Sequence, residues 1–438
     1  MSRTDYQKEN DIIAWNFLER TFFKSFRLPY DEMRATNYGS VEFMLNAACN
    51  QACQYCYLNK YGTELVPKSA RNVNNILKNS ELLIKFLTSN NMHPTYEIFS
   101  GDLFFQRVGF DLLDLILKYS KICKTTDLIL IPTNGTFIMD DERTKKVIYY
   151  LEEFQKLNIQ LGLSLSVDGK YMEENTPMKV GRNYTDNDYD AIFKFAKKFH
   201  CGFHPMIYSH RIDSWIDNFL WFQENFKKYD LPWNGIYLLE VRNKEWSDKQ
   251  INEYLKFVEF LLEWVYNKLD NNPSRLLQFI FKSGFNFLNV FSTIGRGYGC
   301  SIQSCLHVRM GDLFVVPCHR TSYDILNFGK FEVNDDEIVG FKSKNVEFFL
   351  AIQAASVKSN PMCEKCMIKH FCSGQCFGSM YEATGDPFSP IPTVCKLFHG
   401  KLRMVLRTLK RLGCFYLPEF RHINNSKPLF EVIKNLEV

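Results

Sequence analysis

The chain has 438 residues, of which 46% are hydrophobic, so it is long enough for roughly three domains or for one large domain with smaller ones. Its 53 Lys and Arg against 49 Asp and Glu give a formal net charge of +4. This near balance of charges predicts no strong electrostatic attraction to nucleic acid or to a membrane surface.

Targeting signals are not expected. Met1–Asn10 is polar and charged, unlike a signal peptide, and the most apolar stretch, Leu276–Ile294, is too polar for a membrane span. Fourteen Cys without an export signal indicate metal chemistry in a reducing, cytoplasmic compartment.

Short apolar runs alternate with helical patterns from about Val41 to Asn243. The predicted strands are Val41–Leu45, Tyr96–Phe99, Leu128–Pro132, Gln160–Val167, Phe203–Tyr208 and Gly235–Val241. The predicted helices between them are Asn75–Leu87, Leu112–Ile122, Arg143–Leu157, Tyr189–Phe199 and Ile216–Phe226. Strands with helical crossovers predict an α/β fold with a parallel sheet, whose ligand chemistry lies at the carboxyl ends of the strands.

Three thiols follow the first predicted strand at a Cys-x3-Cys-x2-Cys spacing: Cys49, Cys53 and Cys56, with Tyr55 just before the last. Three thiolates on one loop can hold three irons of a four-iron cluster and leave the fourth iron open to a small molecule. A structural zinc site needs a further ligand nearby, and Tyr57–Leu65 contains no Cys or His. A disulfide framework suits a small secreted chain instead.

This spacing, with Tyr55 in place, resembles that of the radical S-adenosylmethionine (SAM) enzymes. The resemblance implies a partial (β/α)6 barrel in which the triad follows the first strand. It also implies that the open iron chelates the amino and carboxylate groups of SAM. The reduced cluster then splits the sulfonium, and the 5′-deoxyadenosyl radical takes a hydrogen atom from a substrate.

The same resemblance places part of a SAM pocket after the second strand, at Ser100, Gly101 and Asp102. Radical SAM proteins usually carry Gly-Gly-Glu there, so two of the three positions differ. Gly101 still permits a close approach of the backbone, and Asp102 keeps a carboxylate.

Later strand ends complete the expected pocket. Thr133 and Asn134 follow the third strand and match a common element of the family, and Ser166 ends the fourth strand in a segment whose Ser contacts SAM in the family. A cation should meet the SAM carboxylate. Either Lys179 or Arg182 can be this cation, and the spacing does not decide between them.

A capping box at Ser247–Gln250 starts a long predicted helix, which Asn271–Pro273 stops. The composition then changes to cysteine-rich loops, and a basic amphipathic helix follows, with Leu402, Leu406 and Leu409 on one face and Lys401 off it. We expect five segments: an N-terminal extension (1–40), the partial barrel (41–246), a helical bridge (247–294), a cysteine-rich iron–sulfur domain (295–400) and a helical tail (401–438).

The C-terminal third carries a second cysteine array, whose tightest part has the spacing Cys-x2-Cys-x5-Cys-x3-Cys over Cys363–Cys376. With the isolated Cys395, this array closely resembles the SPASM extension of radical SAM enzymes that modify peptides and proteins. A zinc ribbon would fit the first pair alone. Eight cysteines beside a radical SAM triad favour two more four-iron clusters, which makes three in total.

The SPASM resemblance implies interleaved ligand sets. The first auxiliary cluster takes Cys300, Cys305, Cys318 and Cys376. The second takes Cys363, Cys366, Cys372 and Cys395. Saturated clusters suit electron transfer. The offset of Cys300 from Cys305 is short for the pattern, and without Cys300 the first cluster would have an open site for substrate.

Other candidate groups lie outside these sets. His319 directly follows a predicted ligand, where it is either a general base or a hydrogen-bond partner. Cys123, Cys201 and Cys414 are expected to be buried core thiols.

These features predict a SAM-dependent radical maturase that cross-links or oxidises a ribosomal peptide or protein. The alternatives are an anaerobic sulfatase-maturing enzyme that forms formylglycine, and a non-catalytic iron–sulfur or zinc scaffold. His319 and the changed Ser100–Asp102 weigh against the sulfatase-maturing enzyme, which tends to carry an acidic residue after the ligand.

The expected partners are a precursor peptide or protein substrate and a small electron donor such as flavodoxin or ferredoxin. A leader-binding domain of roughly 80 residues is not expected in the residues before the first strand. Leader recognition would therefore need a separate protein or another surface.

Overall fold

The computed structural model describes residues 5–36, 39–99, 101–181, 183–282, 285–291, 301–372, 374–424 and 427–436. They form two compact units. The first holds the described residues within 1–166, 177–201 and 300–354, and the second those within 167–176, 202–299 and 355–438. Each unit is discontinuous in sequence, so this division differs from the five consecutive segments that the sequence predicts.

One sheet runs through the first unit in the strand order β11-β10-β9-β8-β1-β2-β3-β4. Its strands are β1 (Ser40–Met44), β2 (Thr95–Phe99), β3 (Leu128–Thr133), β4 (Gln160–Leu165), β8 (Cys305–Arg309), β9 (Phe314–Val316), β10 (Gly329–Asn334) and β11 (Glu337–Ser343). β1 to β4 pair in parallel, as predicted, and β8 adds to β1 in parallel. β9, β10 and β11 continue the sheet antiparallel.

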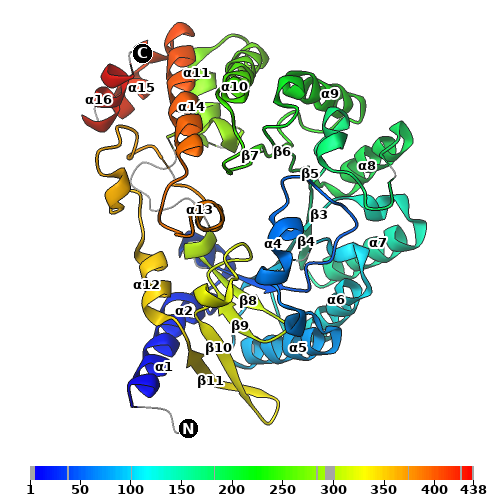
Figure 1. Ribbon diagram of the computed structural model, residues 1–438. Coiled ribbons are helices and arrows are strands. Elements are labelled where there is room, and N and C mark those ends of the chain that lie inside the picture. The colour runs from blue at the N-terminus through cyan, green and yellow to red at the C-terminus, as the bar shows by residue number, and fades with distance from the viewer. Residues whose placement is uncertain are drawn as a thin grey trace. The chain divides into compact units, whose positions relative to one another are not determined.

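Helices of the first unit cover this sheet. They are α1 (Asp5–Leu18), α2 (Lys24–Phe26), α3 (Tyr30–Thr36), α4 (Tyr57–Leu65), α5 (Val73–Ser89), α6 (Arg107–Ser120), α7 (Asp141–Lys156), α8 (Asp186–Phe199) and α12 (Val346–Ala354). Figure 1 shows α5, α6 and α7 side by side along the outside of the strands. α1 packs on β11, where the buried Asp11 accepts the N–H and O–H of Ser343, both at 2.7 Å. The described residues before β1 are therefore part of this unit.

The region predicted as cysteine-rich loops contains the four strands β8 to β11. All five residues of β8 are buried, including His307 and Arg309. Arg309 is only 1% exposed because its guanidinium bonds the Asp312 carboxylate and the carbonyls of Leu65 and Ser322. A strand whose inward positions are charged does not show the apolar pattern from which strands are predicted.

The second unit is mainly helical. Its helices are α9 (Trp215–Lys228), α10 (Asp248–Lys268), α11 (Pro273–Lys282), α13 (Phe377–Thr384), α14 (Pro392–Arg411), α15 (Pro418–Asn424) and α16 (Lys427–Asn435). The predicted capping box at Ser247 and Gln250 starts α10, which packs against α14. Among the described residues, no helix of either unit combines the length and the apolarity needed to cross a bilayer.

Two predictions for the second unit need correction. The predicted strand Phe203–Tyr208 is two short strands, β5 (Gly202–Phe203) and β6 (Met206–Ile207), because Pro205 between them has no N–H to donate; β6 pairs with β7 (Leu239–Glu240). Lys401 is 9% exposed although the pattern places it off the apolar face of α14. Its Nζ lies 3.4 Å from Oε2 of Glu240, which is also buried.

Candidate cofactor site

The triad lies on the loop between β1 and α4 in the first unit. Cys56 directly precedes α4, and its carbonyl oxygen accepts the N–H of Asn59 at 3.1 Å. The N–H of Gln51 lies 3.4 Å from Sγ of Cys49. Burial nevertheless raises the pKa of the Cys49 thiol to about 11, so a metal must displace its proton on binding.

A second segment holds this loop in place. Gln51 forms a β-bridge with Met178, and the N–H of Lys179 donates to the carbonyl of Asn50 at 2.9 Å. The Nζ of Lys179 donates to the carbonyl of Cys49 at 3.0 Å. The exposed ammonium of Lys179 therefore lies beside the triad, whereas Arg182 lies outside the described residues.

The loop after β2 packs tightly on the triad loop. A Cβ on Gly101 would lie 2.4 Å from the carbonyl oxygen of Ala48 and 2.6 Å from that of Ala47. The N–H of Asp102 donates to the same Ala48 oxygen at 2.8 Å. Only glycine fits at position 101, because the close approach is to the backbone of the triad loop. Ser100 lies outside the described residues.

The Asp102 carboxylate is 1% exposed and is fully used within the protein. One oxygen accepts the N–H groups of Phe104 and Phe105, and the other accepts the hydroxyl of Thr133 and the N–H of Asn134. Four donors occupy the roughly four acceptor positions of a carboxylate. Burial raises the pKa of Asp102 despite these bonds. Asp102 therefore ties the loops after β2 and β3 together.

Asn134 connects the loop after β3 to the triad. Its Nδ2 lies 2.8 Å from Oδ1 of Asn50 and 3.7 Å from Sγ of Cys49. Ser166 follows β4, and its N–H donates to the Thr133 carbonyl at 2.7 Å. Tyr55 lies within the triad loop and is part-exposed. Asn134 and the Gly101 loop thus lie beside the triad loop, and Ser166 is bonded to the neighbouring strand end at Thr133.

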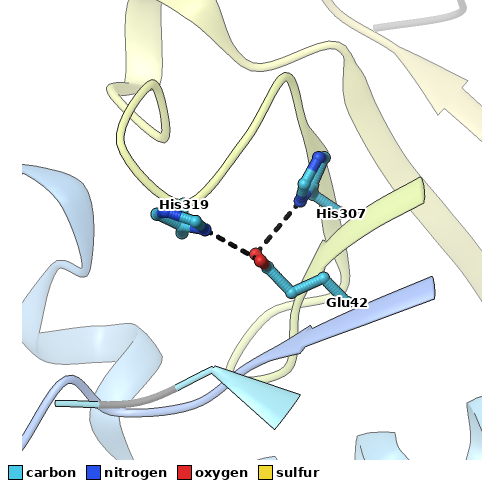
Figure 2. A group of neighbouring side chains, drawn as sticks. All are labelled: Glu42, His307 and His319. Carbon is cyan, nitrogen blue, oxygen red and sulfur yellow. Dashed lines mark hydrogen bonds and ion pairs between the residues drawn. The ribbon is translucent and has the colours of Figure 1, made fainter. Parts of the chain in front are cut away.

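A buried carboxylate pairs with two histidines in the same unit. Figure 2 shows Glu42 of β1 between the rings of His307 of β8 and His319. Oε1 of Glu42 lies 3.1 Å from Nδ1 of His307, and Oε2 lies 2.8 Å from Nδ1 of His319. Strand register places Glu42 beside both His307 and Glu97. Of these three residues, only His319 was predicted from the sequence as a site residue. The signal for Glu42 is that it is the one charge in an otherwise apolar strand segment.

The electrostatics of this group favour a charged carboxylate. Burial alone would raise the pKa of Glu42, but the charges of His319 and His307 and the hydrogen bond with His319 lower it well below its usual range. Burial lowers the pKa of His307, yet Cys305 and Glu42 raise it well above its ordinary value. The three ligand-type atoms lie within 4.8 Å of one another, a spacing that would also suit a metal ion.

Aromatic rings fix the orientation of His319. Its ring stacks on Phe99 with the centroids 4.0 Å apart and lies parallel to Tyr57 at 5.9 Å. The side chain is 30% exposed, so it remains open to a ligand on one side.

The second predicted auxiliary set lies in the second unit. Cys363, Cys366, Cys372 and Cys395 line one cavity of about 30 Å³. Apolar side chains complete much of the lining, as expected around a buried cluster. Burial raises the pKa of Cys395 to about 11. Four thiols on one apolar cavity fit a four-iron cluster.

The first predicted auxiliary set is divided. Cys305 and Cys318 are buried in the first unit, Cys376 directly precedes α13 in the second, and Cys300 lies outside the described residues. Among the remaining thiols, Cys201 and Cys414 are buried. Cys123 is exposed, contrary to the prediction, because it lies in the turn after α6.

In the first unit, four parallel strands carry the cysteine triad after the first of them, and in the second unit four cysteines line one cavity. No family model and no curated protein matches the chain.

Solved structures do match the chain. Native anSMEcpe with bound AdoMet (SAM), an anaerobic sulfatase-maturating radical SAM enzyme, has a TM-score of 0.58 at 17% identity and covers 85% of this chain and 98% of its own. The same protein with AdoMet and the Cp18Cys peptide has a TM-score of 0.55 at 17% identity, with the same coverage. SuiB of Streptococcus suis bound to S-adenosylmethionine has a TM-score of 0.44 at 14% identity, covering 84% of this chain and 81% of its own. The likeness to anSMEcpe confirms the predicted fold.

Proposed function

We propose that this protein is a radical SAM enzyme that modifies a peptide or protein. The observation that carries the proposal is the triad loop, on which three cysteines follow β1 and the strand-end loops at Gly101 and Asn134 pack against them. The fold shared with anSMEcpe, which binds AdoMet and a peptide, supports it. When bound, SAM and its four-iron cluster supply a 5′-deoxyadenosyl radical that removes a hydrogen atom from the substrate.

The pocket residues have separable roles in this proposal. Lys179 is a proposed cation for the SAM carboxylate, because its ammonium lies at the triad loop. Arg182 stays the other candidate. Asp102 and Thr133 act by holding the loops, since they bond each other. Tyr55, Asn134 and Ser166 remain proposed cofactor contacts.

We assign proton acceptance to His319. A substrate radical that is oxidised to a closed-shell product must release a proton. With its Nδ1–H donated to Glu42, the ring keeps Nε2 as the proton-accepting nitrogen. The Glu42 carboxylate then stabilises the imidazolium that forms, as a buried acid does in other acid–base pairs. Phe99 holds the ring in one plane.

The auxiliary ligand sets complete the proposal. Cys363, Cys366, Cys372 and Cys395 would hold the second auxiliary cluster, which the shared cavity supports. Cys300, Cys305, Cys318 and Cys376 remain the proposed ligands of the first. Two saturated clusters would serve to carry electrons away from the oxidised substrate.

The proposed substrate is a ribosomally made precursor peptide that acquires a thioether or carbon–carbon cross-link. The proposed electron donor is a small flavodoxin or ferredoxin, with a separate leader-binding protein as a further partner. Such chemistry would take place in the cytoplasm, where thiols stay reduced.

Anaerobic co-expression with any short peptide that is found to be encoded beside the gene tests the substrate class. Mass spectrometry should find a peptide that has lost hydrogen through a new cross-link. The control is the variant with Cys49, Cys53 and Cys56 replaced by Ala, which should leave that peptide unchanged. A product that reacts with an aldehyde probe would indicate formylglycine and therefore the sulfatase-maturing alternative. Modification by the triad variant would contradict the proposal.

A further inference from the structure

Three hydrogen-bond donors approach the sulfur atoms of the four-cysteine cavity in the second unit. Nε2 of Gln375 lies 3.1 Å from Sγ of Cys395. Nε2 of His399 lies 3.4 Å from Sγ of Cys366. The backbone N–H of Gly374 lies 3.3 Å from Sγ of Cys372. Two of these donors are side chains, so substitution can remove them.

The orientation of the Gln375 amide is fixed by the backbone of Ile391. Oε1 of Gln375 accepts the Ile391 N–H at 2.8 Å, and Nε2 donates to the Ile391 carbonyl at 3.1 Å. An amide NH2 group has two hydrogens. One is used by Ile391, and the other is directed at Cys395. Because Gln375 is only 5% exposed, water does not compete for this hydrogen bond.

His399 reaches the same cavity from α14. It lies one helical turn after Cys395, so both side chains share a face of the helix, and both line the cavity. A thiolate bound to iron carries no hydrogen and can only accept. The His399 ring must therefore be the donor toward Cys366 when a cluster is present.

The surroundings strengthen these bonds. Val357, Ile368, Met380 and Phe398 also line the cavity. Hydrogen bonds to sulfur in an apolar site act in a low local dielectric, where their electrostatic effect is greater than in water. They stabilise negative charge on the cluster, and reduction adds one negative charge.

We propose that Gln375 and His399 are positioning residues that raise the reduction potential of the second auxiliary cluster by donating hydrogen bonds to Cys395 and Cys366. This inference rests on the proposed function, which provides the cluster. The two donors make this cluster a more readily reduced acceptor than it would be without them, and each side chain has a role that does not involve contact with substrate.

The test is a redox titration followed by electron paramagnetic resonance. The background is the variant with Cys49, Cys53 and Cys56 replaced by Ala, so that only auxiliary clusters give signals. His399→Phe and Gln375→Met should each shift one signal to a more negative potential and leave the other signal in place. Cys372→Ala in the same background identifies the shifted signal, because it should remove it.

Two matched variants separate hydrogen bonding from general disturbance. His399→Gln keeps an N–H donor of similar reach and should hold the potential near the parent value. His370→Phe changes a histidine in the same cysteine segment that does not line the cavity, and should cause no shift. If Gln375→Met does not fold, the His399 pair still decides the question.

Different results would contradict different claims. Iron-loaded variants with unchanged potentials would overturn the inference and leave the proposed function intact. Nitrogen hyperfine coupling that shows His399 bound directly to iron would also overturn it, because a ligand is not a hydrogen-bond donor. Zinc in place of iron in the parent would overturn the proposed function itself.

Discussion

Oε2 of Glu42 lies 2.8 Å from Nδ1 of His319, while Oε1 of the same carboxylate lies 3.1 Å from Nδ1 of His307. Since β1 and β8 pair with Glu42 opposite His307, the sheet register fixes one side of this arrangement. The stacked ring of Phe99 fixes the other. A base that must meet one atom of a substrate needs rigid support of this kind.

Substitution of His319 tests its assigned role. We expect His319→Gln to lower the yield of modified peptide by about 10²-fold, the size of effect associated with a positioned general base. Release of 5′-deoxyadenosine should continue, because the base acts after hydrogen abstraction. Glu42→Gln should cause a smaller loss, since the ring remains but its counter-charge is removed.

Chromatography of 5′-deoxyadenosine and mass spectrometry of the peptide measure the two products. The matched control is His210→Gln, which changes an exposed histidine. If His319→Gln abolished nucleoside release as well, the ring would belong to the cofactor site and the assignment as a base would be wrong.

A single methyl group at position 101 should disturb the triad loop. In Gly101→Ala the new Cβ meets backbone oxygen at 2.4 Å, so the loop carrying the triad must shift. We expect the loss of about four irons, the content of one four-iron cluster. Gly62→Ala, in α4 directly after the triad, is the control, because its Cβ has no neighbour closer than 3.9 Å. Equal iron contents in both variants would argue against tight packing of these loops.

The triad and the loops after β1 to β4 could be predicted from the sequence, because each lies within a short run of consecutive residues. The triad occupies eight consecutive residues, and the strands before each pocket loop are apolar runs whose bounds differ from the observed ones by a few residues at most. The close fit at Gly101 could also be anticipated from the residue type, although the group that approaches it is the Ala48 backbone.

The Glu42–His319 pair and the hydrogen bonds of Gln375 could not be predicted, because they join residues that are separated in the sequence. Glu42 and His319 are 277 positions apart and meet only because β8, a strand without an apolar pattern, adds to the edge of β1. In the sequence Gln375 is an ordinary loop residue, and only the structure shows that its amide bonds the backbone of Ile391. Register and loop closure of this kind leave no periodic signal in the sequence.

Removal of one auxiliary ligand should uncouple the two products. Cys372→Ala should lose up to about four irons and keep nucleoside release, because the triad is intact. Peptide modification should fall sharply, since the electron acceptor is impaired. Cys123→Ala removes an exposed thiol outside both arrays and should change neither product nor iron content. Normal peptide product from Cys372→Ala would show that the second auxiliary cluster is structural.

The buried pair Glu240 and Lys401 should stabilise the second unit. Burial alone would raise the pKa of Glu240, but the charges of Lys401 and Arg242 lower it below its ordinary value of 4.5. The carboxylate therefore contributes stability that is present above pH 4.5 and lost as the pH falls through its folded-state pKa. At pH 7, Glu240→Gln should cost about 3 kcal/mol, because it leaves a buried ammonium without its partner.

Anaerobic urea unfolding at pH 7 measures this loss. The double variant Glu240→Gln with Lys401→Met should cost less than the sum of the single changes, because the two groups are coupled. Arg407→Met, on the exposed side of α14, should change stability by no more than about 0.5 kcal/mol. Additive effects in the double variant would mean that the pair contributes nothing.

Anaerobic reconstitution followed by SAM cleavage tests the central claim most directly. The parent chain should bind about twelve irons and, with dithionite, release 5′-deoxyadenosine from SAM. The variant with Cys49, Cys53 and Cys56 replaced by Ala should keep about eight irons and release none. An iron-loaded parent that leaves SAM intact, or a parent that binds zinc with little iron, would contradict the assignment as a radical SAM enzyme.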